Sequence, residues 1–259
     1  MTDRVTITIA DQIADVRLTR ADKMNAIDPA MFAAIGAAID SLHDRTDIRC
    51  VVLSGEGRAF CAGLDMTSMA AGGSGTAPDR NAQGSILPQH VTWGWRQLPM
   101  PVIAAVHGVA FGGGFQIMSG ACIRIAAPDT RFAIRELYWG IVPDMAGWPI
   151  WRGLVRDDVL RELVYTAREF DAAEALRHGF VTRIADDPHA EAMALARTIA
   201  AQSPHAIRAA KRLANAAHDL EPRAMLALET AEQIRLIGKP NMMEQVAAHM
   251  AKRAAVFQD

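Results

Sequence analysis

The sequence predicts an α/β fold in which a sheet covered by helices precedes a helical C-terminal region. Two apolar segments, Cys50–Gly55 and Val102–Val106, are typical of strands that are buried on both faces of a sheet. From residue 157 onward the pattern is mostly helical and rich in alanine. A chain of 259 residues that is 51% hydrophobic fits one large domain, or one domain with a helical appendage.

The first predicted elements form a hairpin. Residues 5–9 alternate between apolar and polar side chains, which is the pattern of a strand with one buried face. Residues 13–18 repeat this pattern, and Asp11 and Gln12 between the two strands are compatible with a short turn.

The first predicted helix follows this hairpin. Asp28 and Pro29 are typical of an N-cap followed by proline in the first helical turn. The apolar positions of this helix have helical spacing, and they are Met31, Phe32, Ile35, Ile39 and Leu42.

Several helices are predicted in the last third of the chain. Residues 171–179 form one that ends on a glycine, and Pro204 and Pro222 open two more. The last predicted helix is amphipathic and covers residues 242–257. Such a tail packs against another subunit or covers its own domain, and the sequence leaves both interpretations open.

Composition excludes several classes of function. The formal net charge is −2, whereas a basic stripe is the usual footprint of nucleic-acid binding. No apolar stretch is long enough to cross a bilayer, and the first residues lack the pattern of a signal peptide. The cysteines, Cys50, Cys61 and Cys122, have no paired or metal-type spacing, and no histidine pair has zinc-site spacing. We therefore expect a cytoplasmic, reduced protein with structural thiols, without a metal site and without nucleic acid or membrane partners.

The most informative stretch is residues 104–116, where an apolar run ends in Gly112, Gly113 and Gly114. Without Cβ atoms, the backbone N–H groups of such a turn can approach a ligand closely. If a helix begins there, its unpaired N–H groups and the positive end of its dipole face the same way. The segment can hold a phosphate or a reaction's oxyanion, or it is a plain strand-to-helix turn.

A second candidate segment is residues 57–65. The small residues Ala62 and Gly63 let a ligand approach the backbone, and Leu64 presents an N–H group after a glycine turn. Asp65 can cap the turn that follows it. Arg58 either meets an anionic group of a ligand or is a solvated surface cation.

A third candidate segment, residues 132–147, carries two carboxylates in apolar and aromatic surroundings, Glu136 and Asp144. Burial would raise the pKa of a carboxyl group toward neutrality, as a general acid or base requires. Either group can instead pair with Arg131 or Arg135.

Residues 70–84 lie between two of the candidate segments and are rich in glycine and polar side chains. This composition is typical of a mobile surface loop rather than of a packed element. The loop either covers a bound substrate or is an insertion without a role.

With these segments in order, the chain resembles the crotonase superfamily, also called the enoyl-CoA hydratase/isomerase family. The resemblance covers nearly the whole chain. The matching segments are residues 23–26, residues 60–65, residues 108–116, residues 132–147, residues 172–181 and the pair Lys252-Arg253.

The resemblance implies a spiral of repeated ββα units over residues 1–195 and a helical trimerisation region over residues 196–259. It also implies trimers, commonly paired into hexamers, and an acyl-CoA thioester as substrate. No separate cofactor is expected, because coenzyme A is part of the substrate. The thioester carbonyl would lie between the N–H groups of Leu64 and Gly113, which would stabilise the oxyanion of an enolate.

The resemblance also implies where the two ends of the substrate lie. The adenine would lie near the turn at Lys23 and Met24, and the phosphates near Arg58. Lys252 or Arg253 of a neighbouring subunit would join the phosphates. The residues implied to bind the CoA part are Lys23, Met24, Arg58, Ala62, Gly63, Asp65, Met66 and Lys252. The acyl group would be lined by residues 70–95 together with Trp139, Met145 and Trp148.

Two departures from the family pattern predict the reaction. A hydratase of this family uses two glutamates beside a bound water. Glu136 matches the second, but Gln116 replaces the first and cannot exchange a proton at neutral pH. Asp144 stands where hydratases usually have glycine and where the dienoyl-CoA isomerase branch has aspartate. We therefore expect Glu136 and Asp144 to act as the acid–base pair of a double-bond isomerase, with Gln116 orienting water or substrate. Hydration stays open beside isomerisation, with Gln116 positioning the water and Glu136 alone moving the proton. A non-catalytic CoA-binding scaffold is the alternative to an enzyme.

Overall fold

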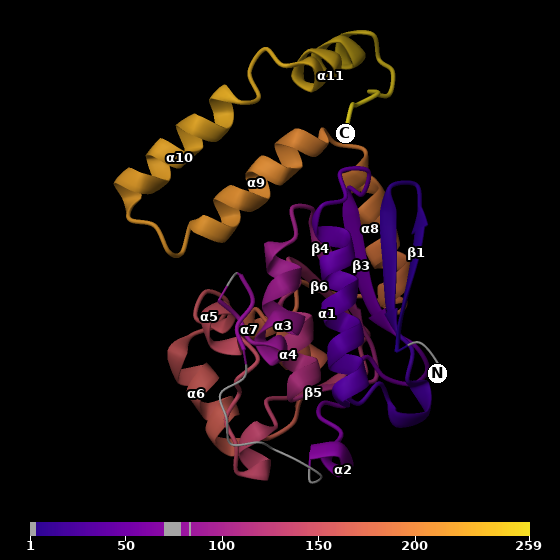
Figure 1. Ribbon diagram of the computed structural model, residues 1–259, viewed down its shortest axis with the longest axis vertical. Helices are drawn as coiled ribbons and strands as arrows, with labels where there is room; N and C mark the ends of the chain where they lie inside the picture. The colour runs from indigo at the N-terminus through magenta and orange to yellow at the C-terminus, as the bar shows by residue number, and fades with distance from the viewer. Residues whose placement is uncertain (1–3, 70–78, 83) are drawn as a thin grey trace.

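The computed structural model describes residues 4–69, 79–82 and 84–259, and these residues form a mixed α/β structure (Figure 1). The described residues contain a six-stranded sheet of order β1-β2-β3-β4-β6-β9 and a three-stranded sheet of order β5-β7-β8. The predicted α/β class is therefore confirmed. Most of the predicted loop at residues 70–84 lies outside the described residues. The strands are β1 (Val5–Ala10), β2 (Ile13–Leu18), β3 (Cys50–Gly55), β4 (Val102–Val106), β5 (Val109–Phe111), β6 (Ile123–Ala126), β7 (Arg131–Ala133), β8 (Phe170–Asp171) and β9 (Arg183–Ile184).

The N-terminal hairpin has the predicted strands and turn. β1 and β2 pair antiparallel, whereas the later strands of the larger sheet pair parallel to their neighbours. Asp11 and Gln12 have positive φ angles of 51° and 62°, as a two-residue hairpin turn requires. β1 lies at the edge of the sheet, and Val5 and Ile7 are its half-buried side chains.

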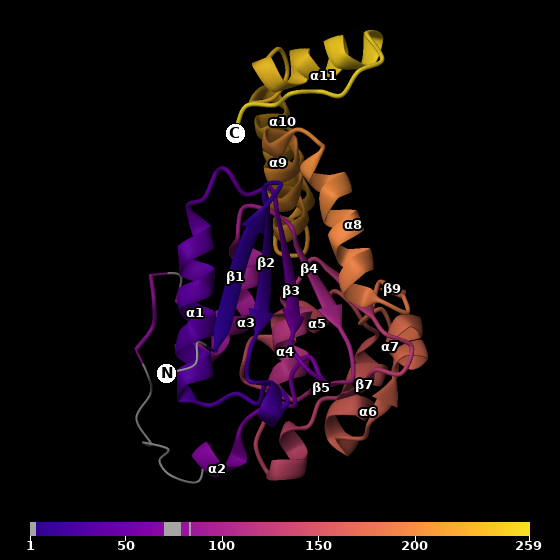
Figure 2. The same cartoon turned by 90° about the vertical axis from the view of Figure 1, so that its right-hand side faces the viewer.

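Helices cover both faces of the larger sheet (Figure 2). α1 (Pro29–His43) and α3 (Leu87–Gln97) pack on one face, and α8 (Pro188–Ala200) packs on the other. β3 and β4 are consequently buried on both faces, as predicted. The predicted start of α1 is also confirmed, because the Asp28 carboxylate accepts a hydrogen bond of 2.8 Å from the Met31 N–H.

The smaller sheet and helix α4 (Gly113–Ser119) carry the candidate site. The Phe115 ring of α4 lies 5.1–6.0 Å from the rings of Phe132, Phe170 and Phe180, measured between ring centres. This aromatic cluster fixes α4 against the smaller sheet. The Cys61 N–H donates to the carbonyl of Val109, and the Phe111 N–H donates to the carbonyl of Cys61, so Cys61 lies alongside β5.

The remaining helices lie around these layers or project from them. α7 (Ala172–His178) is followed by its C-cap Gly179, which has a φ angle of 87°, and α9 (Pro204–Ala216) and α10 (Pro222–Ile234) begin at the predicted prolines. In the described part of the chain, no helix combines the length and the apolar character needed to span a bilayer. These elements are η1 (Ala21–Lys23), α2 (Met66–Met69), η2 (Glu136–Trp139), α5 (Gly147–Trp151), α6 (Asp157–Thr166), α7 (Ala172–His178), α9 (Pro204–Ala216), α10 (Pro222–Ile234) and α11 (Pro240–Met250).

Helices α9, α10 and α11 project from the sheet-containing core (Figures 1 and 2). α9 is fastened to the core by the buried Lys211, whose ammonium donates to the carbonyls of Trp95 and Met100 at 3.2 and 2.6 Å. α10 contacts α9 through an ion pair of 2.6 Å between Arg212 and Glu232. The domain boundary predicted between residues 195 and 196 falls inside α8.

The last predicted helix is present and begins near the predicted start, at Pro240, but its predicted end at residue 257 is wrong, because α11 ends at Met250. Lys252 adopts a φ angle of 50°, which ends the helical conformation. The chain then turns back along α11, where the Val256 N–H donates a hydrogen bond of 2.8 Å to the Glu244 carboxylate. The local hydrogen bonds to Glu244 therefore replace the last predicted helical turns.

Candidate active site

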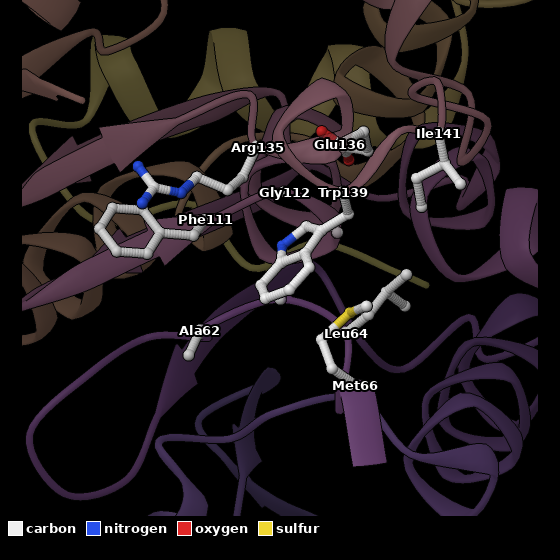
Figure 3. Close-up of a pocket in the computed structure, with 11 residues that line it drawn as sticks. Ala62, Leu64, Met66, Phe111, Gly112, Arg135, Glu136, Trp139 and Ile141 are labelled. Atoms are coloured by element: carbon white, nitrogen blue, oxygen red, sulfur yellow. The ribbon is translucent and has the colours of Figure 1, made fainter. Parts of the chain in front are cut away.

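A pocket of about 150 Å³, here called the site pocket, lies where three chain segments meet (Figure 3). Its lining comes from residues 62–66, residues 111–113 and residues 135–141. The fold thus brings together side chains and N–H groups from three separate predicted segments. The predicted site residues that line it are Ala62, Gly63, Leu64, Met66, Gly113 and Glu136.

Two glycines allow the first two segments to touch. Gly63 has a φ angle of 92°, and a Cβ there would lie 2.7 Å from the carbonyl oxygen of Phe111 and 3.7 Å from the nitrogen of Gly113. A Cβ at Gly114 would lie 2.3 Å from the carbonyl oxygen of Cys61. Any larger residue at either position would push the segments apart.

Two residues of these segments that line the site pocket, Leu64 and Gly113, have backbone N–H groups available to a ligand. Ile27 donates to the carbonyl of Gly63 and accepts from the N–H of Asp65, so the Leu64 N–H between them points away from Ile27. Gly113 is the first residue of α4, where backbone N–H groups have no partner within the helix. Both residues line the site pocket, and such a pair of N–H groups can hold an oxyanion.

Glu136 is the carboxylate of the site pocket and is only 5% exposed. Its Oε1 accepts a hydrogen bond of 2.6 Å from the Gln116 side chain, and its Oε2 is buried without a partner among the described residues. Burial raises the pKa of Glu136, the Gln116 hydrogen bond opposes this shift, and the charge of Asp144 adds a smaller increase. The arrangement leaves a weakened acid at the wall of the pocket, with one of its oxygens held by Gln116.

Gln116 lies behind Glu136 and is not among the residues that line the site pocket. It is 1% exposed, and its Oε1 accepts hydrogen bonds from the N–H groups of Met145 and Gly147 at 3.0 and 3.1 Å. Its amide is therefore occupied by protein groups on both sides.

Asp144 lies in a different cavity, of about 330 Å³, here called the Asp144 cavity. Asp144 as a whole is exposed, but its surroundings partly desolvate the carboxylate and so raise the pKa of Asp144. Trp148 and Trp93 also line this cavity, whereas Trp139 lines the site pocket and Met145 is buried. The residues expected around the acyl group are thus divided between two cavities.

The residues implied to bind the CoA part are only partly gathered around the site pocket. The exposed Lys23 and the half-buried Met24 lie in and beside η1, and the Met24 carbonyl accepts a hydrogen bond of 2.9 Å from the Ala62 N–H. Arg58 lines a separate hollow of about 610 Å³. Lys252 follows α11, which lies at the opposite end of the molecule from α2, where Met66 is located (Figure 1).

Asp65 has a structural role within this segment. Its carboxylate pairs with Arg20 at 2.8 Å and accepts a hydrogen bond of 3.1 Å from the Thr67 N–H. The Arg20 hydrogen bond lowers the pKa of Asp65. The predicted capping of the following turn by Asp65 is confirmed.

Sequence reasoning missed three pocket residues, Phe111, Arg135 and Ile141. The Arg135 guanidinium lies 5.8 Å from the centre of the Phe111 ring, and Trp139 is 52% exposed. Figure 3 shows the Trp139 indole between the Phe111 and Arg135 side chains and those of Leu64 and Met66. Phe111 and Arg135 could have been found from the sequence because they stand next to Gly112 and Glu136. Neighbours of a site residue in a tight turn often line the same cavity.

The thiols and histidines supply no further chemistry to this site. Burial raises the pKa of both Cys50 and Cys61 to about 12, so neither is a ready nucleophile. Within the described ranges, no three His, Cys, Asp or Glu side chains gather in a way that could hold a metal ion.

The α/β core holds one apolar pocket that is lined by a buried carboxylate, Glu136, and by Leu64 and Gly113. The family model of enoyl-CoA hydratase/isomerase matches residues 8–259. The chain belongs to this family, whose enzymes act on CoA thioesters, and the expected crotonase-like fold is confirmed by solved structures.

Relatives named for different reactions have similar sequence identities to this chain. The enoyl-CoA hydratase EchA19 of Mycobacterium tuberculosis is 31% identical over 251 residues, which cover 94% of this chain and 92% of the relative. The 1,2-epoxyphenylacetyl-CoA isomerase of Escherichia coli is 30% identical over 249 residues, which cover 95% and 94%. The enoyl-CoA hydratase structure from Bacillus anthracis is similar with a TM-score of 0.89 and 25% identity, covering 98% of both chains.

Proposed function

We propose that this enzyme moves a carbon–carbon double bond of an enoyl-CoA thioester through an enolate. In this proposal the thioester oxygen accepts hydrogen bonds from the N–H groups of Leu64 and Gly113. Glu136 removes a proton from the carbon next to the thioester, and the released electron pair moves onto the thioester oxygen. Fixed N–H donors that meet developing charge in this way commonly lower a barrier by several kcal/mol.

The second half of the proposed reaction returns a proton at a more distant carbon. The negative charge of the conjugated enolate is shared along the chain, so protonation at the far carbon shifts the double bond. Asp144 is the proposed donor, because its raised pKa favours the protonated form that can give up a proton. Its position outside the site pocket suits a carbon far from the thioester.

The observation that carries this proposal is the state of Gln116. A hydratase needs groups that hold and deprotonate a water molecule, but the Gln116 amide is taken by Glu136, Met145 and Gly147. Hydration is the second candidate, because several relatives carry the name enoyl-CoA hydratase. In that case Glu136 alone would move the proton of the water.

We propose no separate cofactor, since coenzyme A enters with the substrate. We also propose that three chains associate through the C-terminal helices, in a trimer or a pair of trimers. These helices expose large apolar side chains, and exposed apolar surface of this kind marks association sites. Examples are Leu226, Ile234, Ile237, Met243 and Met250. Light scattering coupled to size exclusion should give the mass of three or six chains, and a monomer would contradict this assembly.

The proposed chemistry can be tested without knowing the natural acyl group. In D₂O, the wild-type protein should exchange the proton next to the thioester of butyryl-CoA or hexanoyl-CoA, as followed by NMR. It should also convert members of a panel of 2-enoyl-, 3-enoyl- and 3,5-dienoyl-CoA esters. Glu136→Gln should lower both rates by about 100-fold or more, because the base is lost.

The matched control is Glu162→Gln, which changes an exposed glutamate of α6 that pairs with Arg168. It should leave both rates unchanged. Exchange by the Glu136→Gln protein at the wild-type rate would contradict the mechanism. Binding of CoA esters without exchange or turnover by the wild-type protein would instead favour a non-catalytic scaffold.

A further inference from the structure

We propose that Gln116 is a positioning residue that fixes the Glu136 carboxylate and the backbone behind Gly113 for proton transfer. This inference rests on the proposed enolate chemistry. It replaces the expectation that Gln116 orients water or substrate, since Gln116 does not line the site pocket.

The first step concerns the Glu136 carboxylate. Gln116 Nε2 donates to Oε1 at 2.6 Å, which fixes the plane of the carboxylate and occupies that oxygen. Oε2 is then the oxygen without a partner among the described residues, although it is buried. An unpaired buried carboxylate oxygen costs stability, and such costs are retained where the oxygen has a task. Removing a proton from a bound substrate is a task that fits the Glu136 carboxylate, because Glu136 lines the site pocket.

The second step concerns the loop that contains Met145. Gln116 Oε1 accepts the N–H groups of Met145 and Gly147, and so holds this loop against α4. The sulfur of Met145 lies 3.0 Å from the place that a Cβ on Gly113 would take. Met145 thereby packs against Gly113, which lines the site pocket. One buried amide thus links the base to the support of the oxyanion donor.

The third step explains why glutamine suits this position better than glutamate. An amide both donates to Glu136 and accepts from two N–H groups, whereas an ionised carboxylate only accepts. A glutamate at position 116 would place a second carboxylate beside Glu136, and two adjacent carboxylates ionise only one at a time near neutrality. The Gln116 side chain leaves Glu136 as the single titrating group of its pair.

The test measures the pH dependence of proton exchange on butyryl-CoA in D₂O for Gln116→Leu and Gln116→Glu. Gln116→Leu should lower kcat by about 10- to 100-fold, because the carboxylate and the loop lose their alignment, while KM stays unchanged. The rise of kcat/KM with pH should move to higher pH, since the lost hydrogen bond favoured ionised Glu136. Gln116→Glu should move the rise in the same direction, because two carboxyl groups then share one proton.

The control is Asn241→Asp, which also converts a buried amide to a carboxyl group but lies in α11. Asn241 donates to the carbonyl of Gln258 at 2.8 Å, so its replacement should lower the melting temperature without moving the pH profile. If Gln116 had a merely structural role, its variants would likewise melt at a lower temperature without moving the pH profile. If Gln116→Leu does not fold, Gln116→Glu decides the question, because its protonated form keeps a donor toward Glu136.

The outcomes separate this inference from the proposed function. If the wild-type protein exchanges, Glu136→Gln does not, and the Gln116 variants keep the wild-type kcat and pH profile, the positioning role is wrong and the enolate chemistry stands. If the wild-type protein does not exchange, or Glu136→Gln exchanges equally well, the proposed function itself is wrong.

Discussion

Glu136 and Asp144 are carboxylates of the same segment, yet they lie in contrasting surroundings. Glu136 is 5% exposed and its Oε1 is held by Gln116, whereas Asp144 is exposed at the edge of a separate cavity. Desolvation raises the pKa of both groups, but Glu136 is also influenced by the Gln116 hydrogen bond and the charge of Asp144. A short loop can therefore supply one carboxylate with a fixed geometry and another that exchanges protons with solvent.

This contrast assigns different demands to the two groups. A base that removes a proton from one carbon needs a fixed orientation of its carboxylate, which the hydrogen bond to Gln116 provides. A proton donor that is later recharged from water needs access to solvent, which an exposed position provides. The contrast is useful because each demand can be removed separately by mutation.

The largest expected effect comes from the step on which both carboxylates depend, the stabilisation of the enolate. Gly113 begins α4, where proline is tolerated, so Gly113→Pro removes the N–H group without interrupting a helix. Proton exchange should fall by about 100- to 1000-fold relative to Gly113→Ala, as expected for the loss of one oxyanion donor. Rates of exchange on butyryl-CoA measure this difference.

Gly113→Ala is the matched control for crowding, because its Cβ meets the ends of the Ile27 and Met145 side chains at 2.9 and 3.0 Å. Both variants add this contact, but only proline removes the N–H group. Equal rates for the two variants would mean that the Gly113 N–H does not bind the oxyanion. Circular dichroism checks that both proteins keep the fold.

A smaller effect should separate the two carboxylates themselves. Asp144→Asn should reduce conversion of 3-enoyl- or 3,5-dienoyl-CoA by about 10- to 100-fold, because the distant proton donor is lost. Exchange at the carbon next to the thioester should remain at the wild-type rate, since Glu136 carries that step. Equal loss of both activities would show that the two carboxylates work at one carbon, and the comparison would fail.

The positions of these groups could be predicted from the sequence to different degrees. Short-range patterns predicted the strands around β3 and β4 and the capped start of α1, because burial and capping act within a few residues. The family resemblance identified Leu64, Gly113 and Glu136, which line one pocket. These residues come together because the segments at Gly63 and Gly114 touch so closely that no larger residue fits at either position.

The role of Gln116 and the cavity around Asp144 could not be predicted in this way. Both depend on where the loop at Met145 and Gly147 returns to α4, and that is decided by hydrogen bonds between distant segments. The end of α11 depends likewise on the return of the chain to Glu244. Local sequence propensity does not predict such contacts, because they form only when the rest of the fold is present.

The smallest expected effect is on stability, and it tests how differently the two carboxylates are buried. The folded-state pKa of Glu136 is raised above its ordinary value of 4.5, so its favourable contribution is complete at low pH. That contribution is lost as the pH rises through the folded-state pKa, because the charge must then form in a buried place. Glu136→Gln carries no charge, and it should melt at a higher temperature than the wild type near neutral pH and at a similar temperature in acid.

Asp144→Asn is the natural comparison for this stability effect. The pKa of Asp144 is raised as well, so the sign is the same, but its exposed carboxylate is screened by water and the shift in melting temperature should be smaller. Thermal melts of the three proteins from acidic to neutral pH measure both offsets. An offset for Glu136→Gln that does not change with pH, or a larger one for Asp144→Asn, would contradict the view that Glu136 is the buried base of this pair.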